Sequence, residues 1–587
     1  MARSPGVDAF EFDATINVSA TGESGAATVG RYTWGPVDQE IQVSSIDDFI
    51  AVFNTPTNDN FQDWFSATNF LNYSANLYNI RIVDQATAKN AGIVPVEAPE
   101  EGDALFEKGG VLFKNASDFE MLKSTSTALF AARYAGKLGD SLEISFADAS
   151  TYDTWQYKDE FDTAPNSSPG SETFIADAND ELHVVVVDKG GLFTRTPGAI
   201  LERFAYLSKA ADGRDTSGSG SYYKSVISRT SKYVYAVNDI PDSFMTDVTG
   251  KSSWGGELLT GNQFAELKAP FTGRLGGGSN GETPAKSDYI SGFERLEAIE
   301  DEQLTMIITG ACGGDENHAE VSNLVLDMAA RTKRFVGFVS PKASDVVNVS
   351  SKNDAITNIE ATHAALTSLH SYGHMSTSYK MQYDKFNDAY RWIPGNADDA
   401  GLYARTHNTV GKYASGAGYN RGKYANVVSL AFNPDRTARD RLYRFGINSV
   451  IQERGEGVIL MGDRTLQPKK SAFSQMGTRF LFIDLRTIIA RSAKYSLFEN
   501  NDQFTRAQFR DSIEPLLRDI RGRRGIVDYL IRCDETNNPS SVVEAGEFVG
   551  DIYIKPQYSI QYIRLNFIAV GQDVSFDETT NINAVPV

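Results

Sequence analysis

The sequence contains little cysteine, with only Cys312 and Cys533 in 587 residues. Two cysteines this far apart form neither a disulfide framework nor a metal knuckle, so we interpret both as small, buried apolar residues. No run of about 18 apolar residues is present, which predicts no membrane-spanning helix. The first residues, MARSPGVDAFEFD, lack the basic and apolar blocks of a signal peptide. We therefore expect assembly in a cytoplasm and no direct insertion into a membrane.

Basic residues are also fewer than acidic residues. The chain has 56 lysine and arginine residues against 76 aspartate and glutamate residues, a net charge of −20. Such a charge repels nucleic acid, and we expect no nucleic-acid partner. The balance is uneven, because residues 436–532 contain 19 basic against 11 acidic residues, a net charge of +8, which leaves −28 on the remaining 490 residues. This asymmetry indicates either two surfaces for different partners or a solvated basic face.

Two glycine motifs suggest enzyme chemistry but are incomplete. Gly277, Ser279 and Gly281 match G-x-S-x-G, yet their flanks read as loop, whereas a nucleophile elbow needs a strand before the serine and a helix after it. Residues 310–314 follow a predicted strand and precede a predicted helix, as a dinucleotide loop does. Their spacing is not G-x-G-x-x-G, and acidic residues 315 and 316 stand where phosphate would bind.

Two further patterns fail in a similar way. Residues 416–423 suggest a phosphate loop, but the spacing is wrong and Tyr424 occupies the position of the magnesium-binding hydroxyl. His363, His370 and His374 lie at helical spacing, as in a metal site, but Gly373 interrupts the helix. We predict no enzyme activity, no catalytic residues, no cofactor and no bound metal.

Both ends of the sequence have the alternation of half-buried strands. Near the N-terminus Phe10, Phe12, Ile16 and Val18 point one way and polar residues the other, and residues 19–26 read as a flexible linker. Near the C-terminus, residues 551–555 and 559–570 are β-rich. The second of these segments alternates through Ile563, Leu565 and Phe567. A terminal strand must join a sheet to satisfy its backbone, either in its own chain or in a neighbour.

Between these ends the pattern is that of a mixed α/β protein. Ser45 and Asp48 predict the start of a helix, Asn60 precedes a second helix, and residues 77–83 read as a strand. Residues 305–309, an apolar helix stripe and residues 335–339 predict a β-α-β unit with parallel strands. Later segments are a strand at 183–187, a short helix at 198–207, and flexible loops at 212–221 and 272–283.

The most distinctive stretch, residues 381–422, is rich in aromatic residues, aspartate and arginine and has two glycine-rich turns. It resembles the core signature of the contractile tail sheath proteins of T4-like bacteriophages. Four more segments resemble the same family in the same order: 29–36, 61–83, 130–140 and 495–509. The resemblance is weakest at residues 87–110, where many relatives have a large outer domain.

The resemblance implies a discontinuous α/β core domain with an inserted outer domain, a C-terminal α/β domain and extended β-strand arms at both ends. The expected boundaries are an arm at 1–20, the first part of the core at 21–88, a short linker at 89–114, the inserted domain at 115–285, the second part of the core at 286–430 and a C-terminal domain with its arm at 431–587. Residues Phe10, Phe12, Ile16, Val18, Ile563, Leu565 and Phe567 are the expected arm contacts between subunits.

The function implied is that of a structural subunit of a phage tail sheath, which forms stacked six-fold rings around a tail tube and contracts to drive that tube through the host envelope. Expected partners are other copies of the chain, the tube protein, and the baseplate and tail terminator proteins, within the virion tail. A sheath of a phage-like bacterial injection device is the alternative. A surface-array protein and a nucleotide-dependent enzyme are more remote.

A cluster of arginines between residues 506 and 524 is the predicted contact with the tube. Apolar residues at helical spacing give this segment a core face and leave arginines on its other sides, although Pro515 interrupts the pattern. In the family that the sequence resembles, a basic element of the C-terminal domain faces the tube. Ion pairs within the sheath are the second interpretation. The candidates are Arg506, Arg510, Arg518, Arg521, Arg523 and Arg524.

Overall fold

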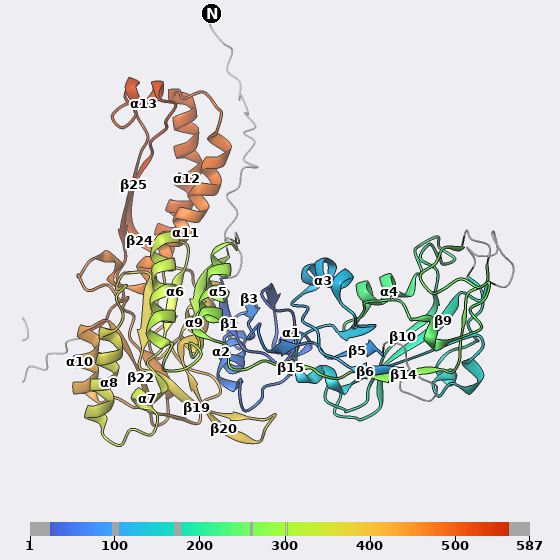
Figure 1. The fold of residues 1–587 in the computed structure, drawn as a ribbon. Helices are drawn as coiled ribbons and strands as arrows, with labels where there is room; N and C mark the ends of the chain where they lie inside the picture. The colour runs from blue at the N-terminus through green and yellow to red at the C-terminus, as the bar shows by residue number, and fades with distance from the viewer. Residues whose placement is uncertain are drawn as a thin grey trace, which may run out of the picture. The chain divides into compact units, whose positions relative to one another are not determined.

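The computed structural model describes residues 24–96, 105–168, 178–258, 262–299, 301 and 303–562. The chain divides into two compact units, one ending at Asn500 and the other beginning at Asn501. Strands and helices are mixed in both units (Figure 1), which confirms the predicted α/β class. Within the described residues, no helix combines the length and the apolar character needed to cross a bilayer.

A large mixed sheet organises the first unit. Over the described residues its strand order is β2-β3-β1-β16-β17-β18-β22-β23. The inner strands are parallel, and β2 and β23 are antiparallel edges. The strands are β1 Gly25–Gly30, β2 Glu40–Val43, β3 Leu77–Arg81, β16 Leu304–Ile308, β17 Val336–Val339, β18 Gly373–Ser376, β22 Ile447–Glu453 and β23 Gly457–Met461. Because both faces of the parallel part are covered, strands such as β16 are buried throughout.

Helices cover both faces of this sheet. One face packs against α1 Ile46–Phe53, α2 Phe61–Leu71, α9 Asn396–Thr409 and α11 Met476–Ala493. The other packs against α5 Lys286–Glu297, α6 His318–Thr332, α8 Lys352–Ala364 and α10 Arg436–Arg444. The predicted helix start is confirmed, since the Ser45 side chain accepts a hydrogen bond from the Asp48 N–H. The parallel β16-α6-β17 unit is also as predicted.

A small sheet stands beside this body. It consists of β19 Tyr379–Asp384, β20 Ala389–Pro394 and β21 Ser429–Leu430, in the order β20-β19-β21. The β19–β20 hairpin extends from the body of the first unit (Figure 1). Its strands pair in register from Tyr379 with Pro394 to Asp384 with Ala389.

The inserted region is built mainly of antiparallel sheets. One sheet has the order β10-β9-β8-β14 and the other β11-β7-β5-β6. Their strands are β5 Gly92–Pro95, β6 Phe106–Lys108, β7 Phe130–Ala132, β8 Leu142–Asp148, β9 Glu181–Asp188, β10 Ala199–Ser208, β11 Val234–Ala236 and β14 Phe271–Arg274. Smaller elements are β4 Ala88–Lys89 with β15 Ser279–Asn280, β12 Met245–Thr246 with β13 Glu266–Leu267, α3 Ala116–Leu122 and α4 Tyr223–Thr230. Most of its apolar core lies between the two larger sheets and α4.

The helix predicted at residues 198–207 is wrong, because this segment is the strand β10. Ile200, Leu201, Phe204 and Leu207 fit a helical stripe, but the register of β10 against β9 shifts twice. Each irregularity reverses the alternation of side chains along the strand. Pairing with the preceding, fully buried strand β9 therefore prevails over the helical pattern within the segment.

Three predicted loops or linkers contain regular structure. Residues 89–114, expected as a linker, contribute β5 and β6 to a sheet with β7, so the inserted region begins before residue 115. The predicted loop at 272–283 includes parts of β14 and β15. The linker predicted at 19–26 is wrong at its C-terminal end. Gly25 and Ala26 lie in the buried strand β1, where a Cβ on Gly25 would come within 2.6 Å of Asn76.

A buried arginine joins the core to the inserted region. The Arg81 guanidinium is fully buried and donates hydrogen bonds to the carbonyl oxygens of Tyr32, Gly35 and Ala135 at 2.8, 2.6 and 2.6 Å. Burial lowers the pKa of Arg81 to about 9, so the side chain stays charged at neutral pH. Two segments singled out in the sequence, 29–36 and 130–140, meet at this residue.

We expect Arg81→Met to destabilise the first unit by about 3 kcal/mol or more, because each buried carbonyl left without a donor costs roughly 1 to 3 kcal/mol. Thermal unfolding followed by circular dichroism measures the loss. Arg203→Met is the matched control, because Arg203 is exposed and pairs only with Glu160 on the surface. Equal melting temperatures for the two variants would show that the buried contacts of Arg81 do not hold the junction.

Candidate assembly surfaces

One helix dominates the second unit. α12 spans Gln503–Gly522, begins with the Asp502 carboxylate accepting from the Thr505 N–H, and continues through Pro515. Phe509, Ile513 and Leu517 form its buried stripe. Pro515 removes one backbone hydrogen bond but does not end the helix, because burial of this stripe supports the turns on both sides.

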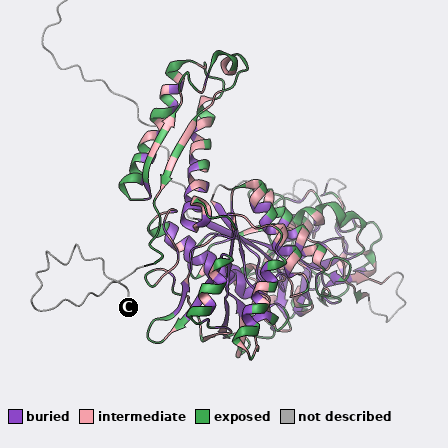
Figure 2. Ribbon diagram, turned by 90° about the vertical axis from the view of Figure 1, so that its left-hand side faces the viewer, coloured by how far each residue is buried: buried purple, intermediate pink, exposed green. Residues whose placement is uncertain are grey.

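The helix packs against an antiparallel pair of strands, β24 Ile526–Arg532 and β25 Asp551–Pro556. Within the described residues these two strands have no third partner, so both outer edges are open. Leu530 and Tyr553, which are cross-strand partners, are each about half exposed. Figure 2 shows mostly exposed and intermediate residues in this unit and a buried large sheet in the first unit.

An isolated pair of strands is marginally stable in water, and open edges are templates for another strand. The strand predicted at 551–555 is confirmed as β25. The predicted arm residues Phe10, Phe12, Ile16, Val18, Ile563, Leu565 and Phe567 lie outside the described residues. The β24–β25 sheet is therefore a candidate acceptor for strands from other copies.

The structure places the six predicted arginines in different surroundings. Arg506 is buried and donates to the backbone and side-chain oxygens of Asn501, so it is not available to a partner. The other five are exposed. Three contact carboxylates: Arg510 with Asp511 at 3.1 Å, Arg518 with Glu514 at 3.0 Å, and Arg523 with Asp519 at 3.0 Å.

Arg521 and Arg524 are the least neutralised members of this group. Arg521 is 3.7 Å from Asp528 and lies over the Tyr529 ring. Arg524 has a φ of 66° and makes no ion pair with the described residues. Residues 501–562 as a whole contain 8 basic and 10 acidic residues, a net charge of −2. The second unit is therefore not a basic body, although one helix in it is rich in arginine.

Most of the positive excess lies in the first unit, where residues 436–500 have 12 basic and 6 acidic residues, a net charge of +6. Helix α10 contributes strongly: Arg436 and Arg444 are exposed without an ion pair among the described residues, and Arg441 pairs with Glu360. Phe445, beside Arg444, is about half exposed. Our sequence analysis did not single out this helix, although its segment RTARDRLYR contains four arginines in nine residues.

The distinctive stretch at 381–422 contributes to a buried polar network at the first turn of α9, which contains Asp398 and Asp399. Asp398 accepts hydrogen bonds from Lys380 Nζ and the Tyr73 hydroxyl, both at 2.9 Å. Lys380 also donates to the Ala425 carbonyl, and the Ala425 N–H donates to the Tyr73 hydroxyl. Burial lowers the pKa of Lys380 and raises that of Asp398, so desolvation opposes the ion pair that their contact forms.

The neighbouring Asp399 is held differently. It is completely buried and accepts a hydrogen bond of 2.5 Å from the Tyr424 hydroxyl. With no cation in direct contact, burial raises the pKa of Asp399 to about 7. His374 Nδ1 is 3.9 Å from Asp399, but burial lowers the pKa of His374 to about 3, so this pair is not an ion pair at neutral pH. The network fastens residues 424–425, after the glycine-rich turns, to the core.

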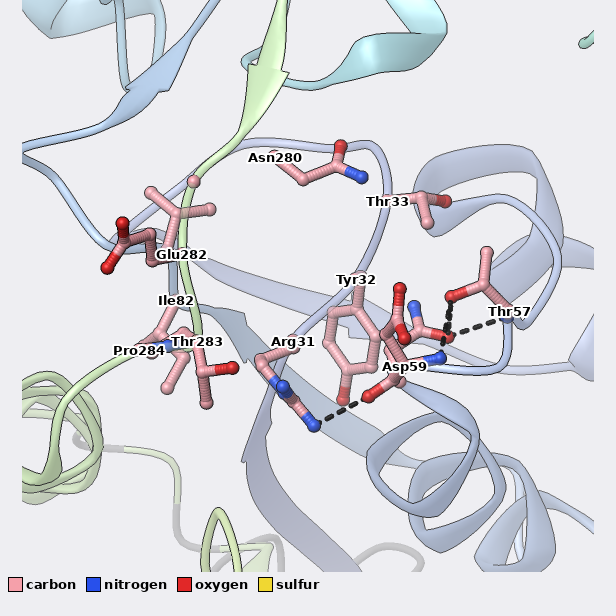
Figure 3. A pocket seen from close by; sticks show the side chains of 13 residues that line it. Arg31, Tyr32, Thr33, Thr57, Asp59, Ile82, Asn280, Glu282, Thr283 and Pro284 are labelled. Carbon is pink, nitrogen blue, oxygen red and sulfur yellow. Dashed lines mark hydrogen bonds between the residues drawn. The ribbon is translucent and has the colours of Figure 1, made fainter.

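A cavity of about 190 Å³ lies near the junction between the core and the inserted region (Figure 3). Arg31 Nη2 donates to the Asp59 carbonyl on one side, and residues 280–284 form the other side. Its lining includes carboxylates and hydroxyls but no nucleophile with an adjacent base. No group of three or more candidate metal ligands occurs within the described residues. We assign no ligand to this cavity.

The weaker sequence motifs have structural explanations. Ser279 lies in the short strand β15, paired with β4, and no helix follows it at once. Asp315, in the turn between β16 and α6, accepts from the N–H groups of Ala343 and Ser344. The three histidines lie on α8, in a loop and on β18, so they do not share one helix. Cys312 is buried as predicted, whereas Cys533 is only partly buried.

Two family profiles match adjoining parts of the chain. The first is described as the phage tail sheath protein central domain and matches residues 284–466, and the second as the phage tail sheath C-terminal domain and matches residues 469–569. The matched regions include α9, α10, α12 and the β24–β25 sheet.

Curated relatives match over almost the full length. The tail sheath protein of Vibrio phage KVP40 is 29% identical, with 98% of this chain and 99% of the relative covered. The tail sheath protein of Enterobacteria phage T4 is 28% identical, with 99% of each covered. Among solved structures, a sheath tail protein of Listeria innocua has a TM-score of 0.53 and 11% identity, over 92% of this chain and 96% of that one, which is a likeness of fold.

The raised pKa of Asp399 predicts that the stability of the folded chain depends on pH. A folded pKa of about 7 against an unfolded value of about 3.9 means that the folded chain binds more protons between these values, so stability falls as pH rises through that range. Asn at this position keeps the acceptor for Tyr424 and removes the titration. We expect the melting temperature of Asp399→Asn, relative to the unsubstituted protein, to rise from pH 5 to pH 8.

Asp398→Asn is the control for this measurement. It weakens the partner of the buried Lys380 ammonium, and we expect it to lower the melting temperature at both pH values. A difference between Asp399→Asn and the unsubstituted protein that is the same at pH 5 and pH 8 would contradict the assigned titration.

Proposed function

Because this chain belongs to the phage tail sheath family, we propose that it polymerises as stacked six-fold rings around a tail tube and contracts to drive the tube through the host envelope. The role is structural, and the protein is a component of the virion tail. The observation that supports polymerisation through strands is the β24–β25 sheet, whose edges have no partner among the described residues.

The proposed link between subunits is strand addition. An arm of about six residues that joins an open edge forms about six backbone hydrogen bonds, each worth on the order of 1 kcal/mol. Ordering the arm costs roughly 1 to 2 kcal/mol per residue. Burial of Phe10, Phe12, Ile16 and Val18 supplies the difference, at roughly 1.5 to 3 kcal/mol for each large side chain. Residues 1–20 and the segment that includes Ile563, Leu565 and Phe567 are the proposed arms.

Such links tolerate a change of lattice. The backbone hydrogen bonds of an added strand depend only on its immediate neighbours, so the bodies can reorient while the strands stay paired. Contacts between the bodies exchange one packing for another during contraction. A baseplate protein would trigger this change and a terminator protein would close the far end of the sheath.

The proposed contact with the tube is made by the exposed arginines of α12 and of residues 523–524, which directly follow it. Arg521 and Arg524 are the strongest candidates, because Arg510, Arg518 and Arg523 are close to carboxylates of their own helix. Partly neutralised arginines still provide planar donors for carboxylates on a partner. A tube with an acidic outer surface is the partner that this helix fits.

Deletion of residues 1–19 tests the arm. We expect the truncated protein to keep its melting temperature, since the described core begins at Ser24, and to lose polymerisation. Negative-stain microscopy of purified protein shows the outcome directly as striated hollow tubes or their absence. Replacement of Phe10, Phe12, Ile16 and Val18 by Ser in the full-length chain is the matched control and should have the same effect. Normal tubes from the truncated protein would refute the arm hypothesis.

Charge reversal tests the tube contact. We expect Arg521→Glu combined with Arg524→Glu to lower co-assembly with purified tail tubes at least tenfold while self-polymerisation falls less than twofold. Co-sedimentation with tubes measures the first quantity and turbidity the second. Arg195→Glu, at an exposed arginine of the inserted region, is the control. If the double variant loses both properties equally, the arginines act within the sheath and not on the tube.

A further inference from the structure

A second cavity, of about 530 Å³, lies beside the β19–β20 hairpin. Helices α1 and α2 form one wall, and the hairpin with residues 426–428 forms the other. The lining is rich in apolar groups, among them Trp64, Phe65, Phe386 and Val427. The cavity opens to solvent, because Tyr383, Lys385 and Val428 in its lining are exposed.

Two amide side chains in the cavity wall lack partners. Asn69 is 1% exposed, and neither its Nδ2 nor its Oδ1 has a hydrogen-bond partner within the described residues. Gln382 is 7% exposed, and its Oε1 is likewise unpartnered there. Buried polar groups without partners are costly and rare, so the cavity wall at these amides is not fully satisfied.

Exposed aromatic residues flank the cavity. Tyr383 and Tyr390 face each other across the hairpin, with ring centroids 5.4 Å apart, and both are largely exposed. Val428 is about half exposed on the neighbouring segment. Apolar residues gathered in this way, next to an open cavity, are typical of an interface with another protein.

A complementary projection occurs elsewhere in the first unit, in the segment after α11. Phe498 is fully exposed and has a φ of 69°, a backbone conformation that is strained for a bulky residue. Tyr495 and Leu497 beside it are also largely exposed. Strained backbone persists at positions that serve a contact or a site. An exposed aromatic side chain held in this way is suited to enter a cavity of another molecule.

Charges at the two places are opposite. Lys385 lies in the lining of the cavity, is exposed and has no ion pair with the described residues. Glu499 directly follows Phe498, is exposed and is likewise unpaired within the described part of the chain. A cavity of about 150 Å³ holds benzene, so a cavity of about 530 Å³ has room for the Phe498 ring together with Leu497.

We propose that Phe498 of one copy inserts into the cavity beside the β19–β20 hairpin of a second copy, with Glu499 pairing with Lys385 at the rim. Projection and cavity lie on different parts of the chain, so the contact is compatible with the head-to-tail association of the proposed rings, in which it runs from copy to copy. This inference rests on the proposed polymerisation and assigns one of the contacts between bodies.

Charge exchange tests the pairing. Lys385→Glu alone and Glu499→Lys alone should each lower the fraction of protein that sediments as tubes at least fivefold, and the double variant should recover to within twofold of the unsubstituted protein. Phe498→Ala should lower it similarly, whereas Phe498→Tyr should not. Lys352→Glu and Met121→Ala, at exposed positions elsewhere, are the matched controls. Harmless single variants, or a double variant no better than either single one, would overturn the proposal.

Disulfide trapping separates this proposal from the polymerisation on which it rests. Lys385→Cys protein and Glu499→Cys protein, both carrying Cys533→Ser, are mixed under oxidising conditions and examined on a non-reducing gel. A crosslinked dimer that forms only in the mixture supports the contact, including under conditions where no tubes form. No crosslink above that of a Lys352→Cys and Met121→Cys mixture refutes it. Absence of tubes from the unsubstituted protein would count against the proposed function.

Discussion

The hydrogen-bonding needs of backbone at strand edges are the constraint on which this structure depends. β24 and β25 pair with each other and leave their outer edges open within the described residues. Backbone groups must find partners wherever they are removed from water, whatever the side chains are. In the proposed sheath, strands added at such edges would give a link that is strong along the strand and insensitive to how the bodies are turned.

A domain that reorients as a rigid unit needs a core whose side chains pack in a single arrangement. The three-layer body of the first unit meets this need through buried polar contacts as well as apolar burial. The Arg81 guanidinium donates hydrogen bonds to three carbonyl oxygens at the junction with the inserted region. Asp398, in the first turn of α9, accepts hydrogen bonds from Lys380 and Tyr73. Such networks are costly to break and have directional geometry, so they favour one arrangement over many near-equivalent ones. Rigid bodies joined by compliant strands can then change their lattice without unfolding.

The parts of the fold that depend on local sequence patterns were predicted correctly. The parts that depend on pairing with other segments were not. Ser45 and the β16-α6-β17 unit were predicted because capping and short crossovers leave their signals within a few residues. Strand β10 was missed because its bulged pairing with β9 is invisible in its own sequence. The arginines of α12 were found by composition, but the burial of Arg506 and the nearby carboxylates depend on the folded helix. The sequence around residues 398–399 does not predict the buried polar network, because the other residues of that network come from distant segments.

The distribution of charge and of backbone strain limits how strong the contacts between subunits can be in the proposed lattice. Most of the basic excess lies on residues 436–500, whereas α12 is largely neutralised by its own carboxylates, so no single surface dominates association. In the proposed assembly, contacts between bodies would have to be weaker than the strand links, since otherwise contraction would break the links first. A contact made by one aromatic residue with strained backbone and one rim ion pair satisfies this order. Surface ion pairs are worth at most about 1 kcal/mol. The specificity of such a contact comes from the fit of the Phe498 ring in the cavity. Its binding free energy is small enough for the contact to be broken and replaced during a change of lattice.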